Sequence, residues 1–137
     1  MPDELVLDAS VAAKLFINEN GSEAARALAA TDARFLAPDL VLVELANIAV
    51  KRLRRGEISP KIAEHIIAGS RSLFRELASS DGLTRRAFVL ATDHGLSTYD
   101  AMYVALAESR GCELVTDDLR LVSRASQAGL AVTIRTP

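Results

Sequence analysis

The sequence lacks the residues on which disulfide-bonded, zinc-binding and membrane-spanning proteins depend. Its 137 residues include a single cysteine, Cys112, which excludes an internal disulfide and a cysteine metal cluster. The two histidines, His65 and His94, do not lie beside the acidic residues described below, so an imidazole zinc site is not indicated. No charge-free run of about 18 apolar residues occurs, and we expect no membrane span. The first four residues lack the basic region of a signal peptide, which together with the single cysteine suits a cytoplasmic protein.

Motifs that carry several common enzymatic chemistries are also missing. There is no glycine-rich phosphate-binding loop of the GxxxxGK or GxGxxG type. The spacing of residues suggests no Ser-His-Asp or Cys-His arrangement either. The sequence therefore gives no support to nucleotide-dependent phosphoryl transfer.

The charges nearly balance, and the formal net charge is −2. This value argues against a nucleic-acid-binding surface spread over the whole protein, but it leaves room for local basic clusters. Residues 51–55, Lys-Arg-Leu-Arg-Arg, hold four cations in five positions. They either complement the dipole at the end of a helix that stops at Gly56, or bind phosphate groups, and the sequence leaves both interpretations open.

Short apolar runs alternate with helical patterns along the chain, and half of the residues are hydrophobic. The pattern predicts strands at 5–7, 34–37, 113–116 and 131–134. It predicts helices from 9 to about 18 and over 23–30, 38–50, 60–77, 84–93, 98–110 and 119–127. Residues 78–82 form a break with room for a short strand that the pattern does not locate. We therefore expect one domain, residues 1–137, of the α/β class: a three-layer α/β/α arrangement around a mainly parallel sheet.

One predicted helix is apolar on almost every side, which is typical of a buried helix. It begins in the stretch Leu96–Ala107 and carries one carboxylate, Asp100, in its first turn. A capping box with Ser97 as the N-cap explains an acid at this position. An ionised carboxylate near a core is nevertheless costly unless it is hydrogen-bonded, paired or bound to a metal.

Three further acidic sites strengthen the second explanation. Asp8 and the Asp117-Asp118 pair each follow a predicted strand, on the side of a parallel sheet where ligands bind. Glu44 lies in the middle of another apolar helix, where capping does not account for it. Each acid taken alone has a structural explanation, but several carboxylates brought together repel one another unless a cation is present.

A hard divalent cation resolves this repulsion, because Mg²⁺ and Mn²⁺ prefer oxygen ligands. Such an ion lowers the pKa of a bound water and offsets charge on a leaving oxygen. The acidic residues therefore favour metal-assisted hydrolysis of a phosphodiester.

Four segments resemble the PIN domain of the VapC toxins, and together they follow the family in order along nearly the whole chain. They are residues 5–14, 38–47, 96–107 and 114–121, in which the block Tyr-Asp-Ala-x-Tyr-Val-Ala-Leu-Ala followed by Leu-Val-Thr-x-Asp is the most specific combination. The resemblance implies a PIN-like fold and a ribonuclease that depends on Mg²⁺, with Mn²⁺ as a substitute. It also implies an RNA substrate, a VapB-type antitoxin as partner, a homodimer and a toxin–antitoxin hetero-oligomer.

The resemblance also assigns residues. It places the family's catalytic acids on Asp8, Glu44, Asp100 and, through the pattern Thr-x-Asp, on Asp118, with Asp117 as a rival metal ligand. We expect Asp8, Asp100 and the fourth acid to hold the metal, partly through water. We expect Glu44 to position or deprotonate the attacking water.

Three further residues match supporting positions of the family. Thr116 and Ser10 match hydroxyl positions beside the acids, and Lys14 fits a basic position that approaches the scissile phosphate. For Lys14, packing of its stem on the core is the alternative.

Two other functions stay open at this point. A receiver-like or phosphatase-like domain also gathers acids around Mg²⁺, but it needs a lysine after a late strand, and no lysine follows Lys61. A non-catalytic interaction module would instead use the acidic pocket as a socket for a basic peptide.

Overall fold

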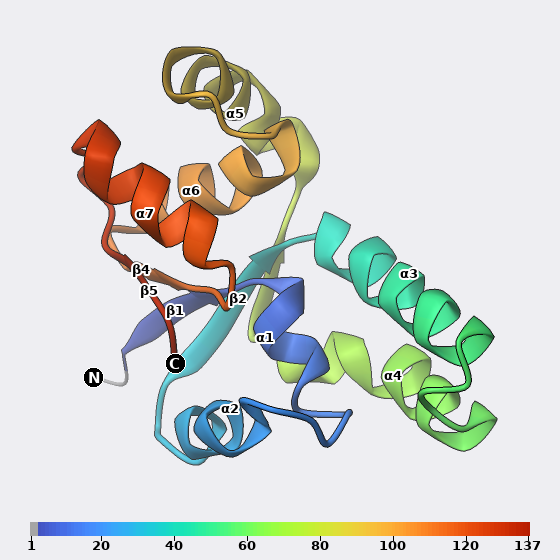
Figure 1. Cartoon of the computed structure of the whole chain (residues 1–137). Coiled ribbons are helices and arrows are strands. Elements are labelled where there is room, and N and C mark those ends of the chain that lie inside the picture. The colour runs from blue at the N-terminus through green and yellow to red at the C-terminus, as the bar shows by residue number, and fades with distance from the viewer. Residues whose placement is uncertain (1–2) are drawn as a thin grey trace.

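The computed structural model describes residues 3–137, so Met1 and Pro2, on which the signal-peptide argument partly rests, lie outside the described residues. Five parallel strands form one sheet in the order β3-β2-β1-β4-β5 (Figure 1). The strands are β1 (Glu4–Leu7), β2 (Arg34–Pro38), β3 (Glu76–Ala78), β4 (Glu113–Val115) and β5 (Ile134–Arg135). The expected α/β class is confirmed, and the sheet is parallel throughout.

Helices cover both faces of this sheet, which gives the predicted three layers. They are α1 (Ala9–Ala13), α2 (Ser22–Ala29), α3 (Leu40–Arg54), α4 (Pro60–Leu73), α5 (Ser80–His94), α6 (Thr98–Arg110) and α7 (Leu119–Ala128). Figure 1 shows α1 to α4 on one side of the sheet and α5 to α7 on the other. None of the helices in residues 3–137 combines the length and the apolar character needed to cross a membrane.

The core lies around β1 and α6. Strand β1 is the middle strand, and Leu5, Val6 and Leu7 are all buried. In α6, seven consecutive residues from Ala101 to Ala107 are buried. This confirms the prediction that the helix is buried on every side in its middle. Burial of this kind contributes about 25 cal/mol for each Å² of apolar surface, and it stabilises the strand that precedes Asp8 and the helix that carries Asp100.

The predicted start of the helix at 38 is wrong. Pro38 is the last residue of β2, and α3 begins at Leu40 with Asp39 as its N-cap. Strand β1 pairs with β2 only as far as Leu36, and the N–H of Asp39 donates to the carbonyl of Ala78 on the other side. The missing N–H of Pro38 therefore interrupts no ladder, and the strand tolerates a proline at its end.

The missing strand is β3, and it lies before the predicted break. Helix α4 ends at Leu73 and not near 77, and residues 76–78 pair with β2. The expected break is instead the start of α5 at Ser80. A strand of three residues is too short to show a periodic pattern, which explains the error. At two further places the prediction was too long or displaced, since α1 ends at Ala13 and β5 begins at Ile134.

Candidate functional site

The carboxyl ends of β1 and β4 form the base of the site. These strands pair in parallel, with Leu7 opposite Val115, so the residues that follow them emerge at the same edge of the sheet. Asp8 follows β1 directly and caps α1, because its Oδ1 accepts from the N–H of Val11 at 3.2 Å. Asp118 caps α7 in the same way, accepting from the N–H of Arg120 at 3.0 Å.

Four carboxylates line one pocket at this edge. The pocket has a volume of about 270 Å³ and is lined by Asp8, Ala9, Ser10, Glu44, Asn47, Ile48, Asp100, Tyr103 and Asp118. Helix α3 contributes Glu44 and helix α6 contributes Asp100, so each helix places its acid at the strand ends. The buried position expected of both helices is right for α6 and wrong for α3, where Val43 is 72% exposed. None of the described residues that line the pocket is a lysine or an arginine.

Two hydroxyl groups connect Asp8 with the loop after β4. The Ser10 hydroxyl donates to Asp8 Oδ1 at 2.6 Å and accepts from the N–H of Asp117 at 3.2 Å. The Thr116 hydroxyl donates to Asp8 Oδ2 at 2.5 Å and accepts from the N–H of Asp118 at 3.0 Å. Each carboxylate oxygen of Asp8 thus receives one hydroxyl, and the two relays fix Asp8 relative to the loop that carries Asp118.

Glu44 has a partner that sequence reasoning missed. The hydroxyl of Tyr103, whose side chain is 2% exposed, donates to Glu44 Oε1 at 2.5 Å. The signal was present in the sequence, because a tyrosine in a buried helix needs a hydrogen-bond partner for its hydroxyl. Asn47, one turn after Glu44, also lines the pocket, but it makes no hydrogen bond with Glu44 among the described contacts.

Asp100 lies in the first turn of α6, and Ser97 is the N-cap, as predicted. The Ser97 Oγ accepts from the N–H of Asp100 at 3.0 Å. This contact leaves the carboxylate of Asp100 among the residues that line the pocket. The helix cap and the position at the pocket therefore coexist at one residue.

Burial and mutual repulsion disfavour the charged forms of three of these acids. Burial is the main cause that raises the pKa of Asp8, of Glu44 and of Asp100 above the usual carboxyl value. Neighbouring charges add to the effect, since Asp100 raises the pKa of Asp8, both raise that of Glu44, and Asp118 raises that of Asp100. Hydrogen bonds from Ser10 and Thr116 oppose the shift in the pKa of Asp8, and the hydrogen bond from Tyr103 opposes that of Glu44. At Asp100, the hydrogen bond with Ser97 and the charge of Arg124 oppose the shift in its pKa. The pocket thus holds negative charge that the protein only partly compensates.

Asp117 and Lys14 lie beside the pocket and not in its lining. Lys14 Nζ is 2.8 Å from Asp117 Oδ2, and the two side chains form an ion pair. Gly21 leaves room for this lysine, since a Cβ added at Gly21 would come within 2.8 Å of Nζ. The structure thus separates the two rival acids: Asp118 lines the pocket and Asp117 pairs with a lysine. The substrate contact expected of Lys14 stays a prediction.

The donor set of the pocket suits a hard divalent cation. The side-chain donors that line it are oxygens, apart from the amide of Asn47. Within residues 3–137, no three carboxylate, imidazole or thiol groups converge closely enough to hold one ion directly. Mg²⁺ commonly binds through one or two carboxylates and keeps several waters, so these residues fit an ion held partly through water. The metal-binding and catalytic roles of Asp8, Glu44, Asp100 and Asp118 stay predictions.

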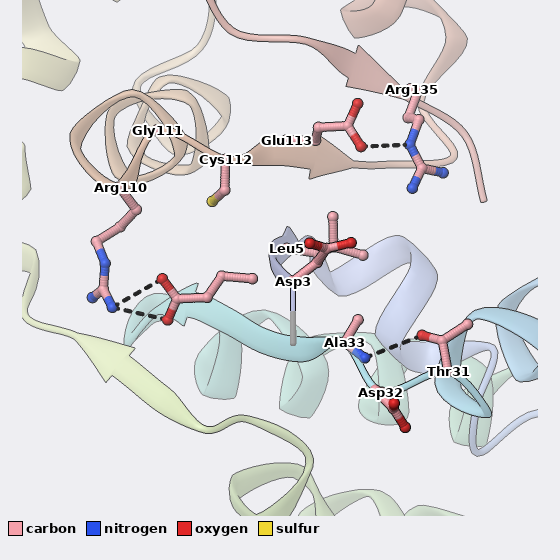
Figure 2. A pocket seen from close by; sticks show the side chains of 11 residues that line it. Asp3, Leu5, Thr31, Asp32, Ala33, Arg110, Gly111, Cys112, Glu113 and Arg135 are labelled. Atoms are coloured by element: carbon pink, nitrogen blue, oxygen red, sulfur yellow. Dashed lines mark hydrogen bonds and ion pairs between the residues drawn. The ribbon is translucent and has the colours of Figure 1, made fainter. Parts of the chain in front are cut away.

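A larger cavity lies at the opposite edge of the sheet, where the strands begin. It has a volume of about 920 Å³, and acidic residues line it beside Arg110, Cys112 and Arg135 (Figure 2). Here arginines pair with the carboxylates: Arg110 donates to Glu4 at 3.0 Å and also to Glu76, and Arg135 donates to Glu113 at 3.1 Å.

Comparisons with known proteins agree with the geometry of the fold. The model of the PIN domain family matches residues 5–126. A Pyrobaculum aerophilum protein named ribonuclease VapC3 is 36% identical over 123 residues, which cover 88% of this chain and 94% of that protein.

Two solved structures share the fold. The crystal structure of PAE2754 from Pyrobaculum aerophilum has a TM-score of 0.70 and 25% identity, and the match covers 97% of this chain and 83% of the other. A toxin–antitoxin complex from Klebsiella pneumoniae contains a chain with a TM-score of 0.57 and 18% identity, covering 83% of this chain and 86% of that one, which shows the fold alone.

Proposed function

This chain belongs to the PIN-domain family, and from that premise we propose that it is a metal-dependent endoribonuclease, the toxin of a type II toxin–antitoxin system. The proposal takes residues 1–137 as one PIN-like domain. It assigns the reaction to the pocket lined by Asp8, Glu44, Asp100 and Asp118. The names of the relatives support it, because VapC3 of Pyrobaculum aerophilum, at 36% identity, is called a ribonuclease.

One observation carries the proposal: four carboxylates line a pocket that contains no lysine or arginine among its described residues. Burial and mutual repulsion raise the pKa of three of them, so the protein maintains an arrangement that costs stability. Arrangements of this kind cluster at functional sites. A divalent cation with a phosphodiester substrate accounts for the number of acids, for their sign and for the lack of a lysine or arginine in the described lining.

We assign Asp8, Asp100 and Asp118 to holding Mg²⁺, for which Mn²⁺ can substitute. The ion, when bound, would lower the pKa of a water molecule and offset charge on the leaving oxygen. Ser10 and Thr116 support this set, because their hydroxyls fix both oxygens of Asp8. Oδ1 also accepts from the N–H of Val11, whereas Oδ2 has Thr116 as its one described donor and keeps a lone pair for a ligand.

We assign Glu44 to the attacking water. Its raised pKa makes the carboxylate a better proton acceptor near neutral pH than an ordinary glutamate. Tyr103 holds one of its oxygens, so the other is free to accept the proton from water. The proton thus moves from the water to Glu44 while the water oxygen bonds to the phosphorus atom of the RNA chain. The bond from that phosphorus to a ribose oxygen breaks, and the released ribose oxygen takes up a proton from solvent.

We propose a VapB-type antitoxin as the partner, together with a homodimer and a toxin–antitoxin hetero-oligomer in the cytoplasm. The toxin–antitoxin complex from Klebsiella pneumoniae, which shares this fold, supports such an assembly. A basic side chain from the partner, inserted among the acids, would neutralise the same charge that otherwise attracts the metal.

The test is cleavage of a structured RNA by the purified protein, free of any partner. We expect cleavage with Mg²⁺, none with a chelator, and none with the Asp8→Asn or Asp100→Asn variant. Glu113→Gln, an acid of the opposite cavity, is the matched control and should cleave as the original protein does. Equal cleavage by all variants, or cleavage that the chelator leaves intact, would refute the proposal. A non-catalytic socket for a basic peptide would show partner binding without any cleavage.

A further inference from the structure

A basic groove continues directly from the acidic pocket. Its lining consists of Ser10, Ala13, Lys14, Glu19, Ile48, Lys51, Arg52 and Arg55, and its volume is about 340 Å³. Ser10 and Ile48 also line the acidic pocket, so the two hollows share a wall. Four cations and one carboxylate line the groove, the reverse of the charge in the pocket beside it.

Helix α3 joins the two hollows along one face. Glu44, Ile48, Lys51 and Arg55 follow one another at intervals of four, three and four residues, which places them in one stripe. At a rise of 1.5 Å per residue, Lys51 lies about 10 Å and Arg55 about 16 Å beyond Glu44 along the helix axis. The stripe thus begins with a carboxylate of the pocket and ends with two cations of the groove.

Two of the four cations have partners within the protein, and two are available. Lys14 pairs with Asp117, and Arg52 Nη1 lies 2.6 Å from Glu19 Oε2. Lys51 forms no ion pair with any described carboxylate, and Arg55, whose side chain is 66% exposed, approaches Glu57 only at 4.0 Å. Folding therefore uses Lys14 and Arg52, and it leaves Lys51 and Arg55 free to meet a ligand.

We propose that this groove binds the backbone phosphates of the RNA strand next to the phosphate that enters the acidic pocket, an inference that rests on the proposed function. A polyanion that enters a pocket of four carboxylates is repelled, and cations beside the pocket compensate for that repulsion. No described residue of the groove lining is aromatic, so the groove offers no aromatic ring on which bases could stack. It holds phosphate, and it adds affinity without selecting the sequence of the bases.

The experiment compares two double variants that remove the same charge. Lys51→Gln with Arg55→Gln removes the available cations of the groove. Lys61→Gln with Arg85→Gln removes two exposed cations on α4 and α5, outside both hollows. Binding of a single-stranded RNA oligonucleotide is measured in chelator over a series of salt concentrations. Thermal melting of each variant checks that it is folded.

We expect the groove variant to bind about tenfold more weakly at low salt, and its slope of log K against log salt to fall by about 1.4, the value for two lost phosphate contacts on a single strand. The control should keep the original slope. Unchanged affinity and slope in the groove variant would overturn the proposal. So would an unchanged RNA slope combined with loss of self-association or of binding to a partner protein, because the groove would then be a protein interface.

Kinetics separate this proposal from the nuclease proposal. With Mg²⁺, the groove variant should raise KM while kcat stays near the original value, whereas Asp100→Asn should lose kcat and keep the salt slope of RNA binding. If the original protein binds RNA through Lys51 and Arg55 but cleaves none, the nuclease proposal fails and the groove stands. If cleavage proceeds and the groove variant keeps the original KM and slope, the groove proposal fails alone.

Discussion

The two edges of the sheet carry similar residues in opposite electrostatic arrangements. At the edge where the strands begin, Arg110 and Arg135 pair with Glu4, Glu76 and Glu113 around the larger cavity (Figure 2). At the edge where the strands end, four carboxylates share a smaller pocket without an internal cation among the described residues. At the first edge, arginines pair with three of the carboxylates. At the second edge, the described lining contains no cation, and only the charge of Arg124 nearby favours the ionised form of Asp100.

The two cavities also differ in size, and the pocket of the proposed site is the smaller one. The larger cavity has about 920 Å³ against about 270 Å³ for the acidic pocket. Glu76 and Glu4 raise the pKa of Arg110, as expected for opposite charges that stabilise one another. Burial and the charge of Asp118 raise the pKa of Asp100, as expected for like charges that repel one another. The carboxylates that need a partner lie in the smaller hollow.

The largest expected effect separates the two neighbouring acids after β4. We expect Asp118→Asn to lower the rate of RNA cleavage by at least about a hundredfold, in the range that a lost catalytic group produces. Asp117→Asn should keep most of the activity, because Asp117 pairs with Lys14 outside the pocket. Single-turnover cleavage rates with saturating Mg²⁺ measure both. An inactive Asp117→Asn protein with an active Asp118→Asn protein would reverse the assignment.

The second prediction concerns the stability of the metal-free protein. A carboxyl group whose pKa is raised by folding binds its proton more tightly in the folded chain. Stability therefore falls as the pH rises from the pKa of the unfolded chain through the pKa of the folded chain. Because folding raises the pKa of Asp8, Glu44 and Asp100, the melting temperature in chelator should rise when the pH is lowered from about 7 to about 5.

A glutamate outside the pocket behaves in the opposite way. The hydrogen bond from Arg86 lowers the pKa of Glu108, so its stabilisation is lost only as the pH falls below the usual glutamate value of about 4.3. The Asp100→Asn variant is the control, and it should show a weaker rise between about pH 7 and 5. A melting temperature that falls throughout this interval would contradict the electrostatic picture of the pocket.

The third prediction tests the partner of Glu44. Tyr103→Phe removes the hydroxyl that donates to Glu44 Oε1 and keeps the ring in the core. We expect a loss of about 1 kcal/mol in unfolding free energy, the usual net value of a hydrogen bond, and about a tenfold lower cleavage rate. Denaturant unfolding and initial rates provide the two measurements. A normal rate in this variant would show that Glu44 keeps its position without the tyrosine.

The smallest effect is expected at the edge of the sheet where arginines pair with carboxylates. Arg110→Gln breaks the ion pairs with Glu4 and Glu76. Partly exposed ion pairs are worth less than about 1 kcal/mol each, so the melting temperature should change by only a few degrees at most. RNA cleavage should be unchanged. A large loss of activity in a protein with a normal melting curve would show that the two edges are coupled.

The sequence was sufficient to predict which acids lie together at one edge of the sheet, but it did not predict which side chains they contact. Asp8 and Asp118 follow from one rule, since the carboxyl ends of parallel strands gather at one edge. Glu44 was recognised because its mid-helix position has no capping explanation. The choice between Asp117 and Asp118 was beyond the sequence, because adjacent residues of a loop point in different directions that depend on the fold around them.

Other features depend on contacts between distant segments. Tyr103 and Glu44 are 59 residues apart in the sequence and lie in different helices. The hydrophobic periodicity of each helix does not show that the two residues are in contact. Strand β3 shows no pattern of its own, since it has three residues and its partner β2 determines its place. Pro38 was assigned to a helix because proline suits the first position of a helix. In the structure it ends β2, where the pairing with β1 has already stopped at Leu36, so the missing N–H of the proline breaks no hydrogen bond to β1.

The pairing of β1 with β4 makes the acidic pocket depend on segments that lie far apart in the chain. Asp8 meets Thr116 across 108 residues of chain, and the last wall of the pocket, Asp118, is made later still. Contacts of such long range form late in folding, because much of the chain must be ordered first. On the proposed function, an incomplete chain on the ribosome that ends before Asp118 is harmless to the RNA around it.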